Sequence, residues 1–372
     1  MPEITAPAIR HESFEVPGWI HVAGGFISRH PRLMVRLGNF ESRCLSDRLA
    51  AVRIDRPIFI TGLARSGTTI LLEVVASHRG IATHRYRDYP PILAPYAWNW
   101  WLSHVPLKQV APVERTHADG IFVTPESPEA MEEVIWMTFF PALHDPARSD
   151  VLDAGVTNPE FESFYRDHIR KIILMRGARY ASKENYNLTR IEYLAKLFPD
   201  ARFVIPIRHP VGHIASLIKQ HRILGAGQRG APRALTHFQR VGHFEFGEDR
   251  RPINAGDSHA VEEIQSLWRA GEEVRGWARY WSMIYGFAGG LLDSSPAIRD
   301  ASMVVRFEDL CARPEHSLAQ LAAHCGLDDP DFVSAHAERL RAPDYYSARF
   351  SEGESAIISE ETAAVRARFG YD

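Results

Sequence analysis

Short apolar runs alternate along the chain with stretches in which apolar residues recur at helical spacing. Residues 57–61 form an apolar run with β-branched side chains that ends at Gly62. From Thr68 onward, the apolar positions 70, 71, 74 and 75 fall on one helical face. This order predicts a strand, a glycine-containing loop and a helix in direct succession.

The same alternation returns farther along the chain. Residues 179–183 are predicted as a strand, and the apolar positions in 188–197 as one face of a helix. Residues 202–207 are predicted as a buried strand, and a helix follows from Pro210 to about residue 222, because proline is tolerated in a first helical turn. A further strand is expected at 301–306. Strands that alternate with helices predict an α/β fold of three layers, with a central parallel β-sheet flanked by helices.

Three segments depart from this alternation. Residues 1–55 are interpreted as an N-terminal helical extension, and residues 331–372 as a C-terminal helical tail that packs on the main domain, 56–330. Residues 224–257 contain many Gly, Arg, His and Pro residues without steady periodicity, so they are predicted as a long loop that acts as a lid. Helical periodicity returns over residues 259–292.

Composition narrows the class of protein. The 372 residues carry a formal net charge of −3, so no overall basic field attracts nucleic acid. The three cysteines lack metal or redox spacing, and we expect no metal site despite 18 histidines. The N-terminus lacks the basic start of a signal peptide, and no long apolar run predicts a transmembrane segment. A soluble, cytoplasmic enzyme is therefore expected.

The glycine loop carries the first chemical signal. Gly62 and Gly67 have the G-x-x-x-x-G spacing of a P-loop, in which backbone N–H groups and a helix N-terminus surround an anion. A nucleoside triphosphatase would place a lysine after the second glycine, whereas this chain has Thr68 there. With Arg65 added, the loop predicts a P-loop-like site for a nucleotide 5′ phosphate rather than for a magnesium-bound γ-phosphate.

At this point the sequence resembles the sulfotransferase superfamily. The residues Arg65, Ser66, Gly67, Thr68 and Thr69 are similar to its phosphosulfate loop, although position 64 is alanine where the family usually has proline. The resemblance implies a bacterial sulfotransferase-like branch, distantly similar to tyrosyl-protein sulfotransferases. It also implies the co-substrate 3′-phosphoadenosine 5′-phosphosulfate (PAPS), without a metal.

Three further motifs continue the resemblance. The segment 207–216 is similar to the family's strand-to-helix motif, which implies that Arg208 and Ser216 hold the nucleotide 3′-phosphate. Lys183 lies in a stretch similar to a lysine segment of the family and is taken, with Arg65, as a catalytic residue. The segment 304–310 resembles a family motif that supports the core.

The acceptor hydroxyl needs a general base within hydrogen-bonding reach. Several branches of the family use a histidine or glutamate near the strand that follows the first helix. By position His84 is the first candidate here, because neutral histidine accepts a proton near pH 7. Asp88 is its rival. The acids Glu126, Glu129 and Glu133 are further alternatives.

These observations predict a PAPS-dependent O-sulfotransferase whose acceptor is a hydroxylated carbohydrate, lipid or small metabolite. The alternatives are a P-loop kinase or nucleotide hydrolase, which Thr68 in the lysine position disfavours, and a binding module without activity. Two aromatic clusters, in residues 86–101 and 277–285, fit an acceptor cleft and core packing equally well.

Overall fold

The computed structural model describes residues 11–105, 111–115, 121–338, 340 and 349–371. A five-stranded parallel sheet lies at its centre, with the strand order β2-β5-β1-β6-β7. The strands are β1 (Ile58–Ile60), β2 (Ile81–Ala82), β5 (Arg179–Lys183), β6 (Arg202–Ile207) and β7 (Ser302–Arg306). The predicted parallel sheet is confirmed, and the strands predicted at 179–183 and 202–207 have these same bounds.

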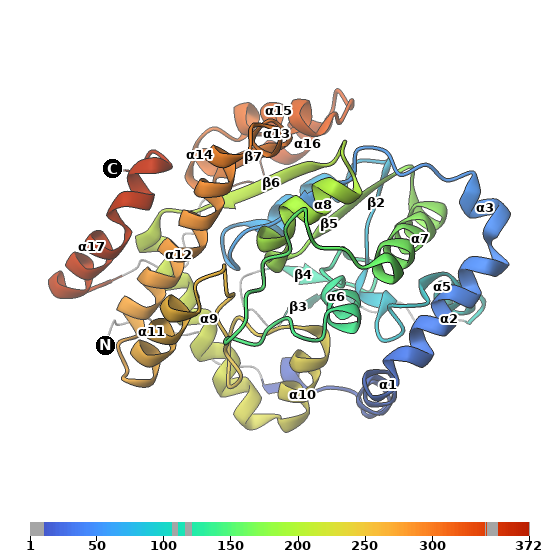
Figure 1. The fold of residues 1–372 in the computed structure, drawn as a ribbon, viewed down its shortest axis with the longest axis horizontal. Coiled ribbons are helices and arrows are strands. Elements are labelled where there is room, and N and C mark those ends of the chain that lie inside the picture. The colour runs from blue at the N-terminus through green and yellow to red at the C-terminus, as the bar shows by residue number, and fades with distance from the viewer. Residues whose placement is uncertain (1–10, 106–110, 116–120, 339, 341–348, 372) are drawn as a thin grey trace.

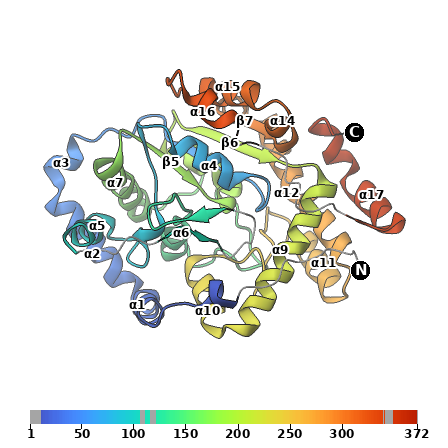
Figure 2. The same cartoon turned by 180° about the vertical axis from the view of Figure 1, so that it is seen from behind.

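Alternate residues of each strand enter two separate cores, which makes the fold three-layered. Ile58 and Ile60 pack with one core, whereas Phe59 between them packs with the other, because side chains alternate across a strand. The first core lies under α4 (Thr68–Ala76), α14 (Phe307–Ala312), α15 (Pro314–Cys325) and α16 (Phe332–Ala337). The second lies under α7 (Pro159–Arg176), α8 (Ile191–Leu197), α9 (Pro210–Gly230) and α12 (Glu273–Ser294). Figure 1 shows the sheet from the side of α8 and α12, and Figure 2 shows α4 in front of it.

The segment before β1 is helical in the structure. It contains a 3₁₀ turn, η1 (His11–Phe14), and the helices α1 (Gly18–Arg29), α2 (Pro31–Cys44) and α3 (Ser46–Ala50). Helix α2 packs against α7, and α1 lies beside α10 (Pro232–Val241), which comes much later in the sequence (Figure 1). The N-terminal helices therefore contact both α7, beside the sheet, and α10.

The predicted lid loop over 224–257 is wrong for residues 224–241. Helix α9 continues to Gly230, and α10 follows almost at once. The glycines that suggested a loop serve close packing instead, since a Cβ on Gly227 would lie 2.4 Å from the ring of Phe14. Only the stretch between Val241 and Ser258 lacks helix and strand. Tertiary packing against η1 therefore overrides the low helix propensity of glycine.

The remaining elements connect or flank these layers. They are η2 (Tyr86–Asp88), α5 (Pro95–His104), β3 (Val113–Glu114), β4 (Phe122–Val123), α6 (Glu133–Phe139), η3 (Asn185–Arg190), α11 (Ser258–Arg269), α13 (Pro296–Ala301) and α17 (Glu352–Arg368). The helix predicted over 259–292 is divided into α11 and α12 at Gly271, whose φ is 79°. Helix α17, in the C-terminal segment, packs along α12 (Figure 1). Among the described residues, no helix is both long and apolar enough to cross a membrane.

Candidate phosphate and acceptor site

The predicted glycine loop joins the central strand β1 to helix α4. Gly67 immediately precedes α4 and has a φ of 104°, and Arg65 has a φ of 72°. These left-handed conformations turn the chain sharply enough for the helix to start directly above the strand. A Cβ on Gly67 would lie 2.9 Å from the ring of Phe307, and one on Gly62 would lie 2.8 Å from the carbonyl oxygen of Pro206. Both glycines are therefore required by the space around the loop.

The structure places the two predicted phosphate-binding segments side by side. The Nε of Arg65 donates a hydrogen bond to the Oγ of Ser216, at 3.3 Å. A second contact joins the segments, since the ring of His213 lies with Nε2 2.9 Å from the carbonyl oxygen of Ala64. Helices α4 and α9 both begin here, and a helix N-terminus attracts anions. The arrangement is suited to a ligand that carries negative charge at two positions.

The segment 304–310 packs against both predicted phosphate-binding segments. The guanidinium carbon of Arg208 lies 5.0 Å from the ring centroid of Phe307, the residue that also limits space beside Gly67. Glu308 accepts a hydrogen bond at 2.9 Å from the backbone N–H of His209, and another at 2.7 Å from the hydroxyl of Tyr371. Phe307 and Glu308 thus hold the start of α9 in register with the glycine loop.

Lys183 and Asn185 continue the site on the other side of β1. Lys183 is the last residue of β5 and stands opposite Ile60 in the parallel register. Asn185 accepts a hydrogen bond at 3.2 Å from the Oγ1 of Thr61 through its carbonyl oxygen. Its side-chain Oδ1 lies 3.5 Å from the Oγ1 of Thr68. The carboxyl ends of β1 and β5 therefore meet at the first turn of α4, as expected for a parallel sheet.

The two candidate bases His84 and Asp88 lie elsewhere, in a buried network. The Nδ1 of His84 donates to Asp88 at 3.2 Å, and its Nε2 pairs with the Nε2 of His168 at 3.0 Å. Both guanidinium Nη atoms of Arg176 donate to the carboxylate of Asp88. His84 is 1% exposed and Asp88 is 0% exposed. Because both ring nitrogens of His84 are engaged and neither side chain reaches solvent, these contacts favour a structural role for the pair, and the assignment of one of them as the acceptor base stays a prediction.

The electrostatics of this network agree with a structural role. Burial by itself would raise the pKa of Asp88, but hydrogen bonds from Arg176 and His84 and their charges hold it far below the ordinary value of 3.8. Burial lowers the pKa of His168 well below its ordinary value, so this ring is neutral. Asp88 is consequently a permanent counter-ion of Arg176 rather than a group that exchanges protons near neutral pH.

Two of the other proposed acids are also ion-paired. Glu126 bonds to the guanidinium groups of Arg85 and Arg87 at the surface. Glu133 is buried and bonds to Arg190 at 2.8 Å. Neither faces the cavity described next. Glu129 does line that cavity, so the structure keeps it as a candidate.

A cavity of about 430 Å³ lies between η1, α1, the strands β3 and β4, and α10. Its wall includes Arg115, whose Nη1 donates to the Oγ1 of Thr69 at 3.2 Å. His243 also lines it, with its side chain 28% exposed and its Nδ1 3.0 Å from the Oε2 of Glu245. The Oε1 of Glu245 accepts from the Nδ2 of Asn185 at 2.8 Å, the same amide that faces Thr68. The side-chain amide of Asn185 therefore links the pair His243 and Glu245 to Thr68, at the end of the glycine loop.

Sequence reasoning missed the pair His243 and Glu245. The available signal was the His-x-Glu spacing, hidden in the stretch that was interpreted as a lid. Burial by itself would raise the pKa of Glu245, but the charge and hydrogen bond of His243, with the charge of Lys183, lower it below the ordinary value. Glu245 is therefore ionised, and it accepts the Nδ1–H of His243.

Comparison with known proteins matches one family to a part of the chain that includes both the glycine loop and the start of α9. The sulfotransferase family matches residues 57–262, more than half of the chain. The chain belongs to the sulfotransferase family. The predicted membership is thus confirmed. The family supports sulfotransfer and not the kinase or nucleotide hydrolase alternative. Among the described residues, no group of three or more metal-ligating side chains comes together.

Individual sulfotransferases are similar along nearly the whole chain. The omega-hydroxy-beta-dihydromenaquinone-9 sulfotransferases Stf3 of Mycobacterium bovis and Mycobacterium tuberculosis are each 24% identical over 357 residues, covering 90% of this chain and 81% of theirs. Sulfotransferase STF1 of Mycobacterium tuberculosis has a TM-score of 0.45 at 15% identity, over 93% of this chain and 84% of that chain. Sulfotransferase STF9 of Mycobacterium avium has a TM-score of 0.48 at 11% identity, over 89% and 82%.

Proposed function

We propose that this sulfotransferase transfers a sulfuryl group from PAPS to a hydroxyl group of an amphiphilic, lipid-like acceptor. The observation that carries the proposal is the contact between Arg65 of the glycine loop and Ser216 of α9, beside a cavity that contains His243. Two anion sites side by side suit a nucleotide phosphorylated at both its 5′ and 3′ positions. The cavity provides a place for the acceptor next to the 5′ site.

The residues present fit the donor nucleotide. The left-handed Gly67 leaves no room for a Cβ, so the backbone of the loop can approach a phosphate closely. Arg65, Thr68 and Thr69 would hold the phosphosulfate end, and Arg208 and Ser216 would hold the 3′-phosphate through charge-assisted hydrogen bonds. When bound, PAPS supplies the activated sulfuryl group. Lys183 would stabilise the negative charge that develops on the leaving oxygen, without a metal ion.

We assign the role of general base to His243. Glu245 accepts its Nδ1–H and thereby fixes the tautomer in which Nε2 is able to take the proton of the acceptor hydroxyl. The lowered pKa of Glu245 means that this carboxylate also stabilises the imidazolium that forms. Glu129, one of the candidates from the sequence, lines the same cavity and is the alternative base.

The walls of the cavity support an apolar acceptor. They include Phe14, Ile20, Tyr89, Met131, Phe238 and Val241. Apolar walls with few polar groups are typical of sites that bind largely apolar ligands. The Stf3 relatives are named as sulfotransferases of a hydroxylated menaquinone. Of the acceptor classes expected from the sequence, a lipid agrees best with these walls.

The donor proposal is tested by thermal unfolding with and without nucleotide. Adenosine 3′,5′-bisphosphate should stabilise the protein, by about 2.7 kcal/mol at a hundredfold excess over Kd, and ATP with magnesium should stabilise it less. The variant Arg208→Ala should lose most of this stabilisation. Arg229→Ala is the matched control, because Arg229 is exposed at the other end of α9 and pairs with Glu248. Stabilisation by ATP alone, or an equal loss in both variants, would refute the donor assignment.

The base is tested by turnover with labelled donor on a panel of hydroxylated prenyl lipids, sugars and phenols. His243→Ala should lower kcat about 10²- to 10⁴-fold with unchanged binding of adenosine 3′,5′-bisphosphate, and added imidazole should restore part of the rate. Glu245→Gln should lower kcat less and shift the pH profile. If Glu129→Gln removes activity while His243→Ala keeps it, the base is Glu129.

A further inference from the structure

The first two helices expose two rows of large apolar side chains. On α1 these are Trp19, Val22 and Phe26, which are 58%, 70% and 47% exposed; on α2 they are Leu33, Leu37 and Phe40, which are 48%, 43% and 56% exposed. Spacings of three, four and seven residues place each row on one side of its helix. We call these six residues the apolar face of α1 and α2. Large apolar side chains exposed on two helices that contact each other mark a place of interaction.

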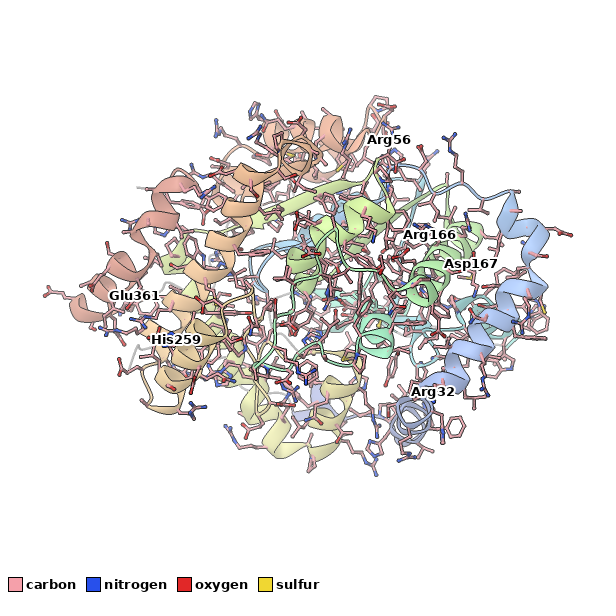
Figure 3. The ribbon with its side chains drawn as sticks, viewed as in Figure 1. Arg32, Arg56, Arg166, Asp167, His259 and Glu361 are labelled. Carbon is pink, nitrogen blue, oxygen red and sulfur yellow. The ribbon has the colours of Figure 1, made fainter. Side chains whose placement is uncertain are left out.

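Arginines flank this face, in a stretch of sequence that contains a single acid. Arg29 ends α1, and Arg32, Arg36 and Arg43 lie on α2; all four are exposed. Figure 3 shows Arg32 near the outer edge of the molecule, beside α1 and α2. Glu41 is the sole acid between Gly18 and Cys44, and it is buried in an ion pair with Lys171 at 3.0 Å. The chain as a whole carries a net charge of −3, so this face is locally positive against the overall charge.

The opposite side of α1 leads to the acceptor cavity. Ile20 lines that cavity, and Gly24 and Ile27 line a second cavity of about 360 Å³ between α1, α6 and α10. Tyr89 borders both cavities. One helix therefore carries exposed apolar side chains on one side and walls of the acceptor region on the other.

Helix α5 extends the exposed apolar surface. It contacts α2 (Figure 1), and its Trp100 and Trp101 are 58% and 48% exposed. Trp101 also stacks on Trp98, with ring centroids 5.0 Å apart. Tryptophan beside arginine and aliphatic residues is the composition of helices that lie in a membrane interface.

We propose that the apolar face of α1 and α2 docks on an anionic phospholipid surface, from which a membrane-borne acceptor enters the cavity behind α1. The positive border selects anionic lipid over a neutral surface. It also argues against a second copy of the chain, because a two-fold contact through this face would bring the arginines of one copy toward those of the other. Delivery of the acceptor rests on the proposed function, whereas binding to lipid does not.

The test is co-sedimentation of the full chain with vesicles, without donor or acceptor. The protein should partition onto phosphatidylglycerol-containing vesicles and weakly onto phosphatidylcholine alone. The double variant Arg32→Glu, Arg36→Glu should lower partitioning about tenfold or more, since each arginine contributes roughly fivefold near an anionic surface. Trp19→Ser with Phe26→Ser should lower it as well. The control is Arg299→Glu, on exposed α13 at the far end of the molecule (Figure 1). It is compared with the single variant Arg32→Glu, which changes the net charge by the same amount.

Each outcome has a definite meaning. All variants change exposed side chains, and their circular dichroism spectra and urea unfolding midpoints report that they are folded. Absence of vesicle binding by the unchanged chain, or equal loss in Arg299→Glu, would overturn the proposal. Self-association that the same variants abolish would assign the face to a second copy instead. If the nucleotide stabilises no form of the protein but vesicles still bind it, the proposed function fails while the docking surface stands.

Discussion

Replacement of Asp88 by asparagine tests whether the network around His84 supports the fold or catalyses the reaction. The carboxylate of Asp88 accepts hydrogen bonds from Arg176, His84, Asn99 and the backbone N–H of Arg85. Asparagine has the same shape but replaces one acceptor oxygen by an amide donor. The variant therefore leaves Arg176, whose side chain is 6% exposed, without its counter-ion and places a donor opposite donors.

The expected loss follows from this burial. Removal of one partner of a buried ion pair costs about 3–5 kcal/mol of folding free energy, and the additional lost hydrogen bonds place Asp88→Asn in the upper part of that range. The matched control lies on α7, the helix that carries Arg176. Asp167 pairs with Arg170 at 3.1 Å, with side chains 31% and 35% exposed, and Figure 3 shows Asp167 on α7. Asp167→Asn should cost only about 0–1 kcal/mol.

The assay is equilibrium unfolding in urea, followed at neutral pH for the unchanged chain and both variants. Turnover is then measured at a temperature at which each variant is folded. We expect a large fall in the midpoint for Asp88→Asn, with kcat of the folded protein changed by less than roughly threefold, because only groups near the reacting atoms enter the barrier directly. A variant as stable as Asp167→Asn that has lost turnover would refute this reasoning and return Asp88 to the active site.

Four further outcomes are expected. Gly67→Ala should weaken binding of adenosine 3′,5′-bisphosphate and lower stability by about 1–3 kcal/mol, because its φ of 104° and the nearby Phe307 oppose a Cβ. Gly290→Ala, with open space around it in α12, should stabilise the protein by up to about 1 kcal/mol in equilibrium unfolding in urea. Glu308→Gln should weaken binding of the same nucleotide about tenfold in a titration, with little change in kcat at saturation, because it loosens the start of α9. For pH, burial by itself would raise the pKa of Glu133, but Arg190 and His144 lower it to about 2 from 4.5. The contribution of the ionised Glu133 to stability is thus complete above about pH 4.5 and is lost between pH 4.5 and 2. Acid unfolding of the unchanged chain should show this loss, and acid unfolding of Glu133→Gln should not.

Much of the fold could be predicted because its signals are local. Strands β5 and β6 have the predicted bounds, since five consecutive buried residues between turn signals leave few alternatives. The loop from Gly62 to Thr69 also has a local signature. The lid failed as a prediction because Gly227 is required by Phe14, which lies more than two hundred positions earlier. No pattern within a window of the sequence reports such a contact.

The choice of base separates the two kinds of information most clearly. His84 has a suitable position in the sequence, but its burial against Asp88 and His168 depends on how α7 packs over β2 and η2. His243 and Glu245 become a pair near the glycine loop only because Asn185, the first residue of η3, lies between them and Thr68.

The sequence by itself determined the family motifs, the alternation of strands and helices, and the glycine loop between β1 and α4. These depend on residues close together in the chain, where spacing alone fixes which side chains share a turn or a face. Only the tertiary structure decided which titratable groups are buried, which line the cavity and which apolar side chains of α1 and α2 stay exposed. Burial and proximity across the molecule depend on packing between elements that are distant in the sequence. A histidine or leucine has one role where that packing buries it and another where it stays exposed.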